Sequence, residues 1–257
     1  MKAKSIQEIG ALLKSIKNPE DPFLQECRAD GRKGVQSLLQ RWEKAYEKQL
    51  QLELKWTEMN SYEIAARKEG HAFIAGVDEV GRGPLAGPVV ACAVILPQDY
   101  KLLGLDDSKK ISETRREELY VQIMNNAISV GIGIIDQKVI DDINIYEASK
   151  AAMVKAIGEL SLAPDYLLVD AMKLPVAIKQ ESIIKGDAKS VSIAAASVVA
   201  KVTRDRLMCK YDLEYPQYGF KKNMGYGTGE HLKALKEFGP TPYHRMSFSP
   251  VKECVYS

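Results

Sequence analysis

Residues 73–96 constrain the fold more than any other stretch of the chain. They read FIAGVDEVGRGPLAGPVVACAVIL, which is two apolar runs joined by a loop of glycines and prolines. The runs, 73–77 and 89–96, have the length and the β-branched content of buried strands. An acidic pair, Asp78 and Glu79, follows the first run directly. A carboxylate at the end of a buried strand is costly unless it is hydrated, paired or bound to a cation, so a positive group must lie nearby.

Two explanations of the loop that follows the acidic pair remain open. In the first, the loop is an ordinary hairpin connection in which Arg82 pairs with Asp78. In the second, the acidic pair binds a divalent metal ion. Gly81 and Gly83 carry no side chains, so the backbone N–H and C=O groups of the loop can approach a ligand closely. This stretch alone does not decide between the two explanations.

Three further runs have the composition of strands and alternate with helical patterns. They lie at 128–135, 166–169 and 182–185. Ser112 is expected to cap the helix before the first of these runs, and Asn144 to cap the helix after it. Strands that alternate with helices indicate an α/β domain built around a mixed or parallel sheet.

Carboxylates recur where the apolar runs end. Asp170 follows the run at 166–169, and Asp187 lies just past the run at 182–185. The carboxyl ends of strands form the ligand-binding edge of an open α/β sheet, so these side chains are expected to converge with Asp78 and Glu79. A set of carboxylates without matching Cys or His residues favours hard divalent cations over zinc. Taken singly, each carboxylate is explained as a helix cap or a surface charge.

The helix that follows Asp187 is expected to run from about 192 to 211. It begins with three alanines at 194–196, which are small enough for tight packing on a sheet. Its later turns carry four basic residues, whose charges are mostly explained by the dipole at a helix C-terminus. These residues are Lys201, Arg204, Arg206 and Lys210.

Residues 215–248 interleave aromatic, basic and glycine residues. Such a mixture is typical of segments that hold a sugar-phosphate chain by charge and aromatic contact. The side chains of interest are Tyr218, Lys221, Lys222, Tyr226, His231, His244 and Arg245. A packed helix over 229–238, flanked by turns, is the plainer explanation of the same residues, and the two are compatible.

Residues 1–70 are expected to form an all-helical extension, and 71–257 the main domain. Ser5 and Glu8 have the spacing of a capping box, and Asp21 precedes a proline as a helix N-cap does. A long polar-rich helical pattern then extends from Val35 to about Arg67. The sequence leaves the role of the extension open between substrate binding and support of folding.

The composition indicates a soluble, cytoplasmic protein. The formal charge of +2 comes from residues 1–70, which hold 13 Lys/Arg and 11 Asp/Glu, while the remaining residues hold 23 of each. The four cysteines form no CxxC pair, which disfavours a zinc knuckle or redox motif. The N-terminus lacks the apolar core of a signal peptide, and no run approaches membrane-spanning length.

The chain resembles the ribonuclease HII family, the type 2 ribonucleases H, over about 72–257. Six motifs of that family occur in the family's order: GVDEVGRGPLAGPVV at 76–90, DDSK at 106–109, LLVDAM at 167–172, KGDAKSVSIAAASVVAKVTRD at 185–205, GYGT at 225–228 and GPTPYHRMSF at 239–248. The resemblance implies an RNase H-like mixed sheet flanked by helices. It also implies a metal-dependent endonuclease that cuts the RNA strand of RNA/DNA hybrids and nicks duplex DNA 5′ of a single ribonucleotide.

The resemblance implies a role for individual residues. Two divalent ions, Mn2+ or Mg2+, are bound by the four carboxylates that the strand ends also select: Asp78, Glu79, Asp170 and Asp187. The backbone of Gly81, Arg82 and Gly83 recognises the ribose 2′-hydroxyl, which distinguishes RNA from DNA. Tyr226 stacks on the next sugar. Three further side chains hold phosphates: Ser108, Lys109 and Arg245.

Our hypothesis for the mechanism is two-metal hydrolysis that leaves 3′-hydroxyl and 5′-phosphate ends, with Asp78 bridging the ions. We expect a monomer whose partners are RNA/DNA hybrids and ribonucleotide-containing duplex DNA, with no membrane partner. Two other classes remain open from the residues alone: a non-catalytic RNA/DNA-binding module and a metal-dependent phosphotransferase on small molecules. The aromatic and basic segment at 215–248 disfavours the phosphotransferase, since small ligands need no such extended surface.

Overall fold

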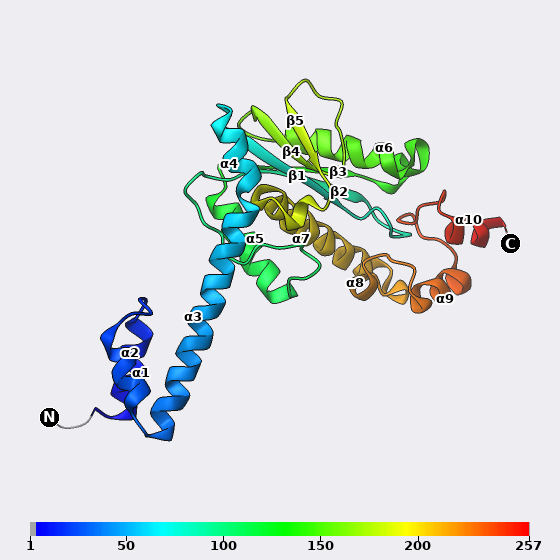
Figure 1. Ribbon diagram of the computed structural model, residues 1–257. Helices are drawn as coiled ribbons and strands as arrows, with labels where there is room; N and C mark the ends of the chain where they lie inside the picture. Colours follow the sequence, from blue (N-terminus) through cyan, green and yellow to red (C-terminus); the bar gives the residue numbers. More distant parts are fainter. Residues whose placement is uncertain (1–3, 257) are drawn as a thin grey trace. The chain divides into compact units, whose positions relative to one another are not determined.

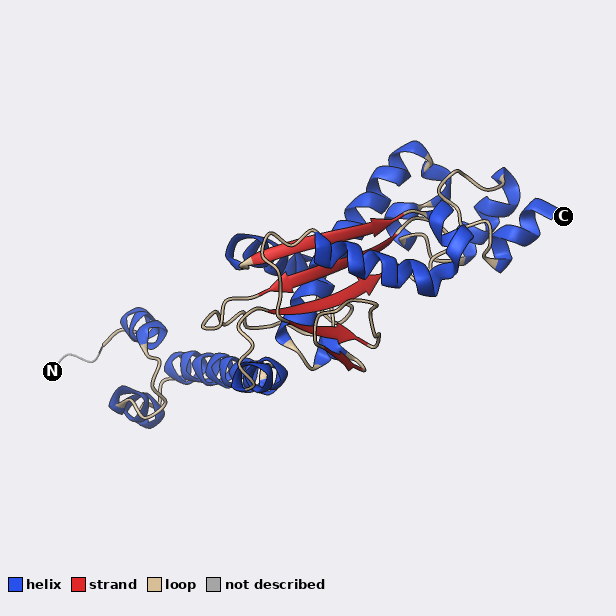
Figure 2. Ribbon diagram, turned by 90° about the horizontal axis from the view of Figure 1, so that it is seen from above, coloured by secondary structure: helices blue, strands red, loops and turns tan. Residues whose placement is uncertain are grey.

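A computed structural model describes residues 4–256 and contains a mixed five-stranded sheet in the order β3-β2-β1-β4-β5. β1 pairs antiparallel with β2 and parallel with β4, so it lies at the centre of the sheet, whose strands are drawn in red in Figure 2. β2 pairs antiparallel with β3, and β4 pairs parallel with β5. The strands are β1 Ile74–Val80, β2 Val89–Ile95, β3 Ser129–Ile135, β4 Tyr166–Asp170 and β5 Gln180–Ile183.

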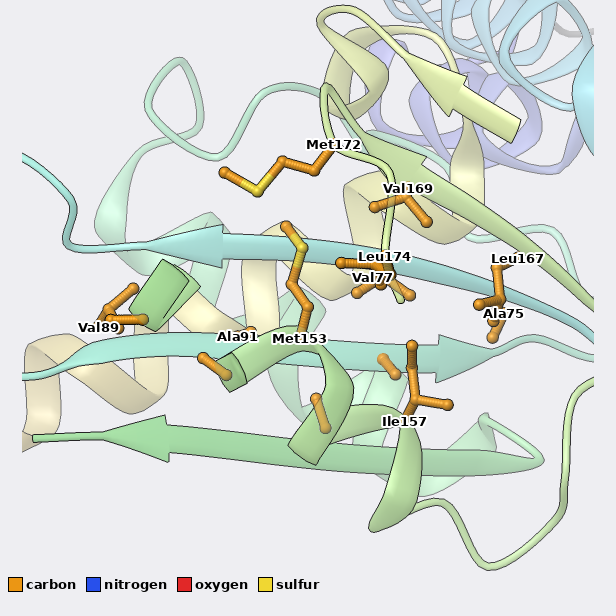
Figure 3. Packing of buried hydrophobic residues seen from close by; sticks show 14 of the residues in the cluster. Ala75, Val77, Val89, Ala91, Met153, Ile157, Leu167, Val169, Met172 and Leu174 are labelled. Atoms are coloured by element: carbon orange, nitrogen blue, oxygen red, sulfur yellow. The ribbon is translucent and has the colours of Figure 1, made fainter. Parts of the chain in front are cut away.

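Two long helices cover opposite faces of this sheet (Figure 1). α6, Gln137–Gly158, packs on β3 and β2, while α7, Val191–Glu214, packs on β1 and β2. Figure 3 shows Met153 and Ile157 of α6 lying over the apolar side chains of β1 and β2. On the other face, Ile193 of α7 packs beside Ile74 and Leu168. The buried strands thus read as nearly continuous apolar runs.

Glycines allow this close packing of helices on the sheet. A Cβ at Gly76 would lie 2.0 Å from the Ser192 carbonyl carbon, so α7 can approach β1 only because that side chain is absent. Cβ atoms at Gly131 and Gly133 would each lie 2.0 Å from a carbonyl oxygen of α6. α6 can therefore lie this close to β3 only because these two residues carry no side chains.

Helices precede the first strand, as the sequence predicts. They are α1 Ile6–Ser15, α2 Pro22–Ala29, α3 Lys33–Met59 and α4 Ser61–Lys68. Ser5 and Glu8 form the predicted capping box of α1, and Asp21 caps α2. The chain divides into two compact units, Met1–Thr57 and Glu58–Ser257. The first unit has a small core of its own, which includes Ile9, Leu24 and Val35.

The remaining helices lie between the strands and after α7. They are α5 Glu113–Asn126, the 3-10 turns η1 Gly186–Ala188 and η2 Pro216–Tyr218, then α8 Phe220–Asn223, α9 Gly229–Phe238 and α10 Ser249–Tyr256. Ser112 caps α5, and α9 has the bounds that the sequence predicts. No helix of residues 4–256 is long and apolar enough to cross a bilayer.

Two local predictions are corrected. α6 begins at Gln137, with Asp136 as its N-cap, and not at Asn144. Asn144 has a φ of 67° and kinks the helix, while its side-chain oxygen accepts hydrogen bonds from the N–H groups of Tyr146 and Glu147, so it caps only the second part. β5 covers 180–183 instead of 182–185, because its register is set by pairing with β4.

α4 is tied to the start of α7 by one buried carboxylate. Glu63 is 2% exposed, and its Oε1 accepts hydrogen bonds from the Ser190 hydroxyl at 2.6 Å and from the Ser192 N–H and hydroxyl at 3.0 and 2.6 Å. Ser190 is the N-cap of α7. A negative side chain at this position also complements the dipole of a long helix. Glu63 thus fixes the turn that joins Asp187 to α7.

We predict that Glu63→Gln lowers the free energy of unfolding by about 2 kcal/mol, because a neutral amide oxygen accepts the three buried hydrogen bonds less strongly than a carboxylate oxygen does. Glu69→Gln is the matched control, since Glu69 pairs with Lys179 at 2.6 Å but its side chain is 56% exposed. An exposed ion pair contributes less than about 1 kcal/mol. Urea unfolding of the full chain measures both variants. Equal losses would contradict the role assigned to Glu63.

Candidate metal centre

Parallel pairing of β1 and β4 brings three carboxylates together. Val77 lies beside Val169 in this pair, so Asp78 and Asp170, the next residues, reach the same edge of the sheet. One carboxylate oxygen from each of Asp78, Glu79 and Asp170 lies within 4.8 Å of the others. The convergence predicted from the strand ends is therefore observed for these three residues.

Burial disfavours the charged form of these carboxyls. Asp78 is 5% exposed, and its pKa is raised well above the usual value, first by burial and then by the charges of Glu79 and Asp170. Burial raises the pKa of Glu79 to about 7, against the opposing effect of Arg82. Burial also raises the pKa of Asp170. Negative charge in such a site is stable only beside a compensating cation.

Asp187 lies next to this group, in the η1 turn, and is not one of the three. The Gly186 N–H donates a 2.6 Å hydrogen bond to Asp170 Oδ1, which fixes η1 against the end of β4. The pKa of Asp187 is raised by burial, then by the negative charges of Asp107 and Asp170. The carboxylate of Asp187 therefore interacts electrostatically with this acidic edge.

The cations of residues 4–256 neutralise this edge only in part. Arg82 Nη1 lies 3.5 Å from Glu79 Oε1, in an ion pair whose arginine side chain is 45% exposed. The pairing of Arg82 with Asp78 considered from the sequence is not among the ion pairs of residues 4–256, and Glu79 Oε2 is buried without a hydrogen-bond partner there. An all-oxygen donor set with excess negative charge fits hard divalent cations such as Mn2+ or Mg2+.

The glycine loop and Tyr226 lie side by side next to the carboxylates. A Cβ at Gly83 would lie 3.4 Å from Tyr226 Cε1, and the Tyr226 side chain is 43% exposed. Gly81 has a φ of +96°, which favours glycine, and a Cβ there would overlap the Arg204 side chain. An exposed aromatic ring thus adjoins a loop that is buried at Gly81 and exposed at Arg82 and Gly83.

Ser108 and Lys109 occupy different environments although they are neighbours. Ser108 is 4% exposed, and its hydroxyl accepts a 2.9 Å hydrogen bond from the Ser197 hydroxyl. Lys109 is exposed, and its charge partly offsets the rise in pKa that burial causes at Asp170 and Asp187. Lys109 therefore lies at the acidic edge, where a phosphate could reach it.

The structure corrects the phosphate contact expected of Arg245. Arg245 is 0% exposed, and its guanidinium donates to the carbonyl oxygens of Gly81, Arg82 and Gly87. Arg204 is 1% exposed and donates to the carbonyls of Pro88, Ala86 and Met224, so the helix-dipole explanation is wrong for it. Neither side chain can reach a nucleic acid.

His231 and His244 are also buried, and their hydrogen bonds define their protonation. The Thr241 N–H donates to His244 Nδ1, so the proton of a neutral His244 is on Nε2, which lies 2.9 Å from His231 Nε2. His231 then donates from Nδ1 to the carbonyl of Tyr226 at 2.9 Å. Burial lowers the pKa of His244 to about 4. The pair thus holds the backbone of Tyr226 and does not contact phosphate.

Sequence reasoning missed two groups next to the carboxylates. The Ser197 hydroxyl lowers the pKa of Asp78, and the charge of Asp107 raises the pKa of Asp187. Ser197 has one signal in the sequence, since it and Ser192 are the polar residues within the small and apolar first turns of α7. Asp107 belongs to a polar turn that the sequence marks without assigning a role to this carboxylate.

Two family models match the chain. The model described as Ribonuclease HII matches residues 75–251, and the model described as Ribonuclease HII N-terminal domain matches 5–67. A protein named Ribonuclease HII from Bacillus subtilis (strain 168) is 59% identical over 252 residues, which cover 98% of this chain and 99% of that protein. Another of that name, from Enterococcus faecalis, is 56% identical over 258 residues, covering 99% and 100%.

Solved structures share the fold. The ribonuclease H2 of Pyrococcus horikoshii OT3 superposes with a TM-score of 0.62 at 25% identity, covering 71% of this chain and 97% of that chain. Bst-RNase HIII in complex with Mn2+ superposes with a TM-score of 0.59 at 17% identity, covering 75% and 72%. The predicted RNase H-like mixed sheet with an N-terminal helical region is thus confirmed.

The metal-free stability of the protein should depend on Glu79 and on pH. The pKa of Glu79 is about 7 in the fold and 4.5 in the unfolded chain. As pH rises from 4.5 to 7, the unfolded chain loses this proton first, so folding becomes less favourable. We predict that Glu79→Gln stabilises the protein in EDTA, by about 2 kcal/mol more at pH 8 than at pH 5.

Urea unfolding at the two pH values measures this difference. Added Mn2+ should reverse the order at pH 8, because it stabilises the wild-type chain more than the variant. An equal gain in the free energy of unfolding at both pH values would contradict the raised pKa of Glu79. An equal effect of Mn2+ on the two proteins would contradict the metal centre.

Proposed function

Because the chain belongs to the ribonuclease HII family, whose members hydrolyse the RNA strand of RNA/DNA hybrids, we propose that it also nicks duplex DNA 5′ of a single embedded ribonucleotide. The observation that carries this proposal is the position of the Gly81–Arg82–Gly83 loop. The loop lies directly after the metal-binding carboxylates and against the exposed ring of Tyr226. The loop that recognises one ribose in this proposal therefore adjoins the carboxylates that act on the neighbouring phosphodiester bond.

The carboxylates are assigned to the chemistry. Two divalent ions held by Asp78, Glu79, Asp170 and Asp187 would supply an activated water and charge stabilisation of the departing 3′ oxygen. Asp78 is the most buried of these carboxylates and lies within 4.8 Å of both Glu79 and Asp170, so we assign it to bridge the ions. The products are 3′-hydroxyl and 5′-phosphate ends. No histidine is assigned as a base: His231 and His244 are buried in a hydrogen-bonded pair, and His71 packs on Tyr166 at the start of β4, the end opposite to Asp170.

The substrate contacts follow from the same geometry. The backbone N–H groups of the Gly81–Arg82–Gly83 loop bind the 2′-hydroxyl, because this hydroxyl can accept as well as donate. The ring of Tyr226 stacks on the adjoining deoxyribose. Lys109 holds a phosphate beside the metal ions, and Ser108 acts through its backbone and its bond to Ser197. Arg245 has no direct contact with substrate in this proposal.

The domain roles are part of the proposal. Residues 71–257 form the catalytic domain, and the helical extension 1–70 contributes to substrate binding. The extension carries the formal excess of positive charge, with 13 Lys/Arg against 11 Asp/Glu. Its contribution would appear as a salt-dependent part of the affinity for duplex.

We predict that Asp78→Asn lowers the cleavage rate of a ribonucleotide-containing duplex in Mn2+ by at least about a thousandfold, since a metal-bridging carboxylate is lost. The affinity for the uncleaved duplex should change by less than about threefold. Single-turnover gels and fluorescence anisotropy measure the two quantities. Near-normal turnover would exclude Asp78 from the metal centre, and loss of both quantities would indicate misfolding.

Tyr226→Ala should lower cleavage at a single ribonucleotide by about 10- to 100-fold, since stacking on a sugar or base contributes about 1–3 kcal/mol. Cleavage within a continuous RNA strand should fall much less, because the junction contact is not needed there. Tyr226→Phe is the control and should keep both activities. Equal losses on both substrates would assign Tyr226 a structural role.

A further inference from the structure

Arg204 and Arg245 are buried cations that form no ion pair within residues 4–256. Their exposed fractions are 1% and 0%. A buried charge is unfavourable unless its hydrogen bonds are satisfied, and here main-chain carbonyl oxygens satisfy them. Burial accordingly lowers the pKa of Arg245 to about 9 and that of Arg204 to about 10. Such an arrangement indicates that the two arginines fix the backbone around them.

Arg245 holds both ends of the glycine loop. Its Nη2 donates to the carbonyls of Gly81 and Gly87, at 2.5 and 2.8 Å. Its Nη1 donates to the carbonyl of Arg82 at 2.9 Å, and Nε donates to Gly87 at 3.0 Å. The guanidinium also lies 5.0 Å from the ring centre of Phe248, which limits its movement.

Because the peptide bonds are planar and trans, the bonds from Arg245 to the carbonyls also fix the direction of the N–H groups that follow. The peptide bonds of residues 4–256 are all trans, so the C=O of one residue and the N–H of the next point in opposite directions. The carbonyls of Gly81 and Arg82 point at the guanidinium. The N–H groups of Arg82 and Gly83 therefore point away from it, and no residue of 4–256 accepts a hydrogen bond from either.

We infer that Arg245 is a positioning residue for 2′-hydroxyl recognition: by drawing the carbonyls of Gly81 and Arg82 inward, it presents the N–H groups of Arg82 and Gly83 to the ribose. This inference rests on the proposed function and names the side chain that prepares its recognition loop. Because the donors are set before substrate arrives, binding does not have to order them.

Lysine cannot replace arginine in this role. Guanidinium has five donors in a rigid planar fork, whereas the lysine ammonium is a point charge with three donors. Only the fork reaches Gly81, Arg82 and Gly87 together. Arg204 has the same burial and a similar set of carbonyl acceptors, but its acceptors are Ala86, Pro88 and Met224. Arg204 is thus a matched control for the stability of this region.

The test measures affinity for a DNA duplex with one ribonucleotide and for the same duplex without it, in EDTA to prevent cleavage. The Kd for the all-DNA duplex divided by the Kd for the ribonucleotide duplex measures 2′-hydroxyl recognition, and a value of 1 means none. Arg245→Lys should lower this ratio about tenfold, toward 1, while the Kd for all-DNA duplex stays within about threefold. Arg204→Lys should lower the thermal unfolding temperature about as much as Arg245→Lys does. Its ratio of the two Kd values should equal that of the wild-type chain.

Each other outcome is decisive. A folded Arg245→Lys that keeps the wild-type ratio overturns the positioning role and leaves the proposed function intact. An equal loss of ratio in Arg204→Lys also overturns it, because general loosening of the region would then explain the result. A wild-type chain with no ribonucleotide preference overturns the proposed function, and the positioning role with it.

A measurement on the unmodified chain decides the case in which Arg245→Lys does not fold. NMR-detected hydrogen exchange should show fast exchange for the Arg82 and Gly83 amides in the free protein, because they have no acceptor. The ribonucleotide duplex should slow both, and the all-DNA duplex should not. Amides that are already protected in the free protein, or that both duplexes protect equally, would overturn the inference.

Discussion

The carboxylates at the ends of β1 and β4 form the constraint on which the rest of the structure depends. Asp78, Glu79 and Asp170 are drawn together by parallel strand pairing, although burial and mutual repulsion raise their pKa values. Only a rigid sheet can hold like charges in this way. The close packing of α7 at Gly76 and the Glu63 contact at the start of α7 supply that rigidity.

Positive charge is stabilised in another way beside the glycine loop. Arg204 and Arg245 are buried and satisfied by carbonyl oxygens, so they need no counter-ion within the described chain. Arg245 orients the loop that follows the carboxylates, whereas Arg204 fixes the backbone at Ala86, Pro88 and Met224. The carboxylate group has excess negative charge, which favours metal binding. Next to it lies the glycine loop, which the buried Arg245 holds in place.

Much of this could be predicted from the sequence. Helix caps at Ser5, Asp21 and Ser112 depend on neighbouring residues alone, and they were predicted correctly. The convergence of Asp78 with Asp170 follows from where strands end. The roles of Arg204 and Arg245 could not be predicted, because the burial of an arginine depends on carbonyls from distant segments. The kink at Asn144 was missed because Asp136 offers a competing cap upstream.

The most direct test of the central claim maps the cut in a DNA duplex that contains one ribonucleotide, with Mn2+ or Mg2+. Our account predicts a single metal-dependent nick on the 5′ side of that ribonucleotide, because sugar recognition and cutting occur at adjacent groups. Cleavage confined to longer runs of RNA would contradict single-ribonucleotide recognition by the Gly81–Arg82–Gly83 loop and Tyr226. Absence of cleavage with either metal would contradict the assignment of the carboxylates to catalysis.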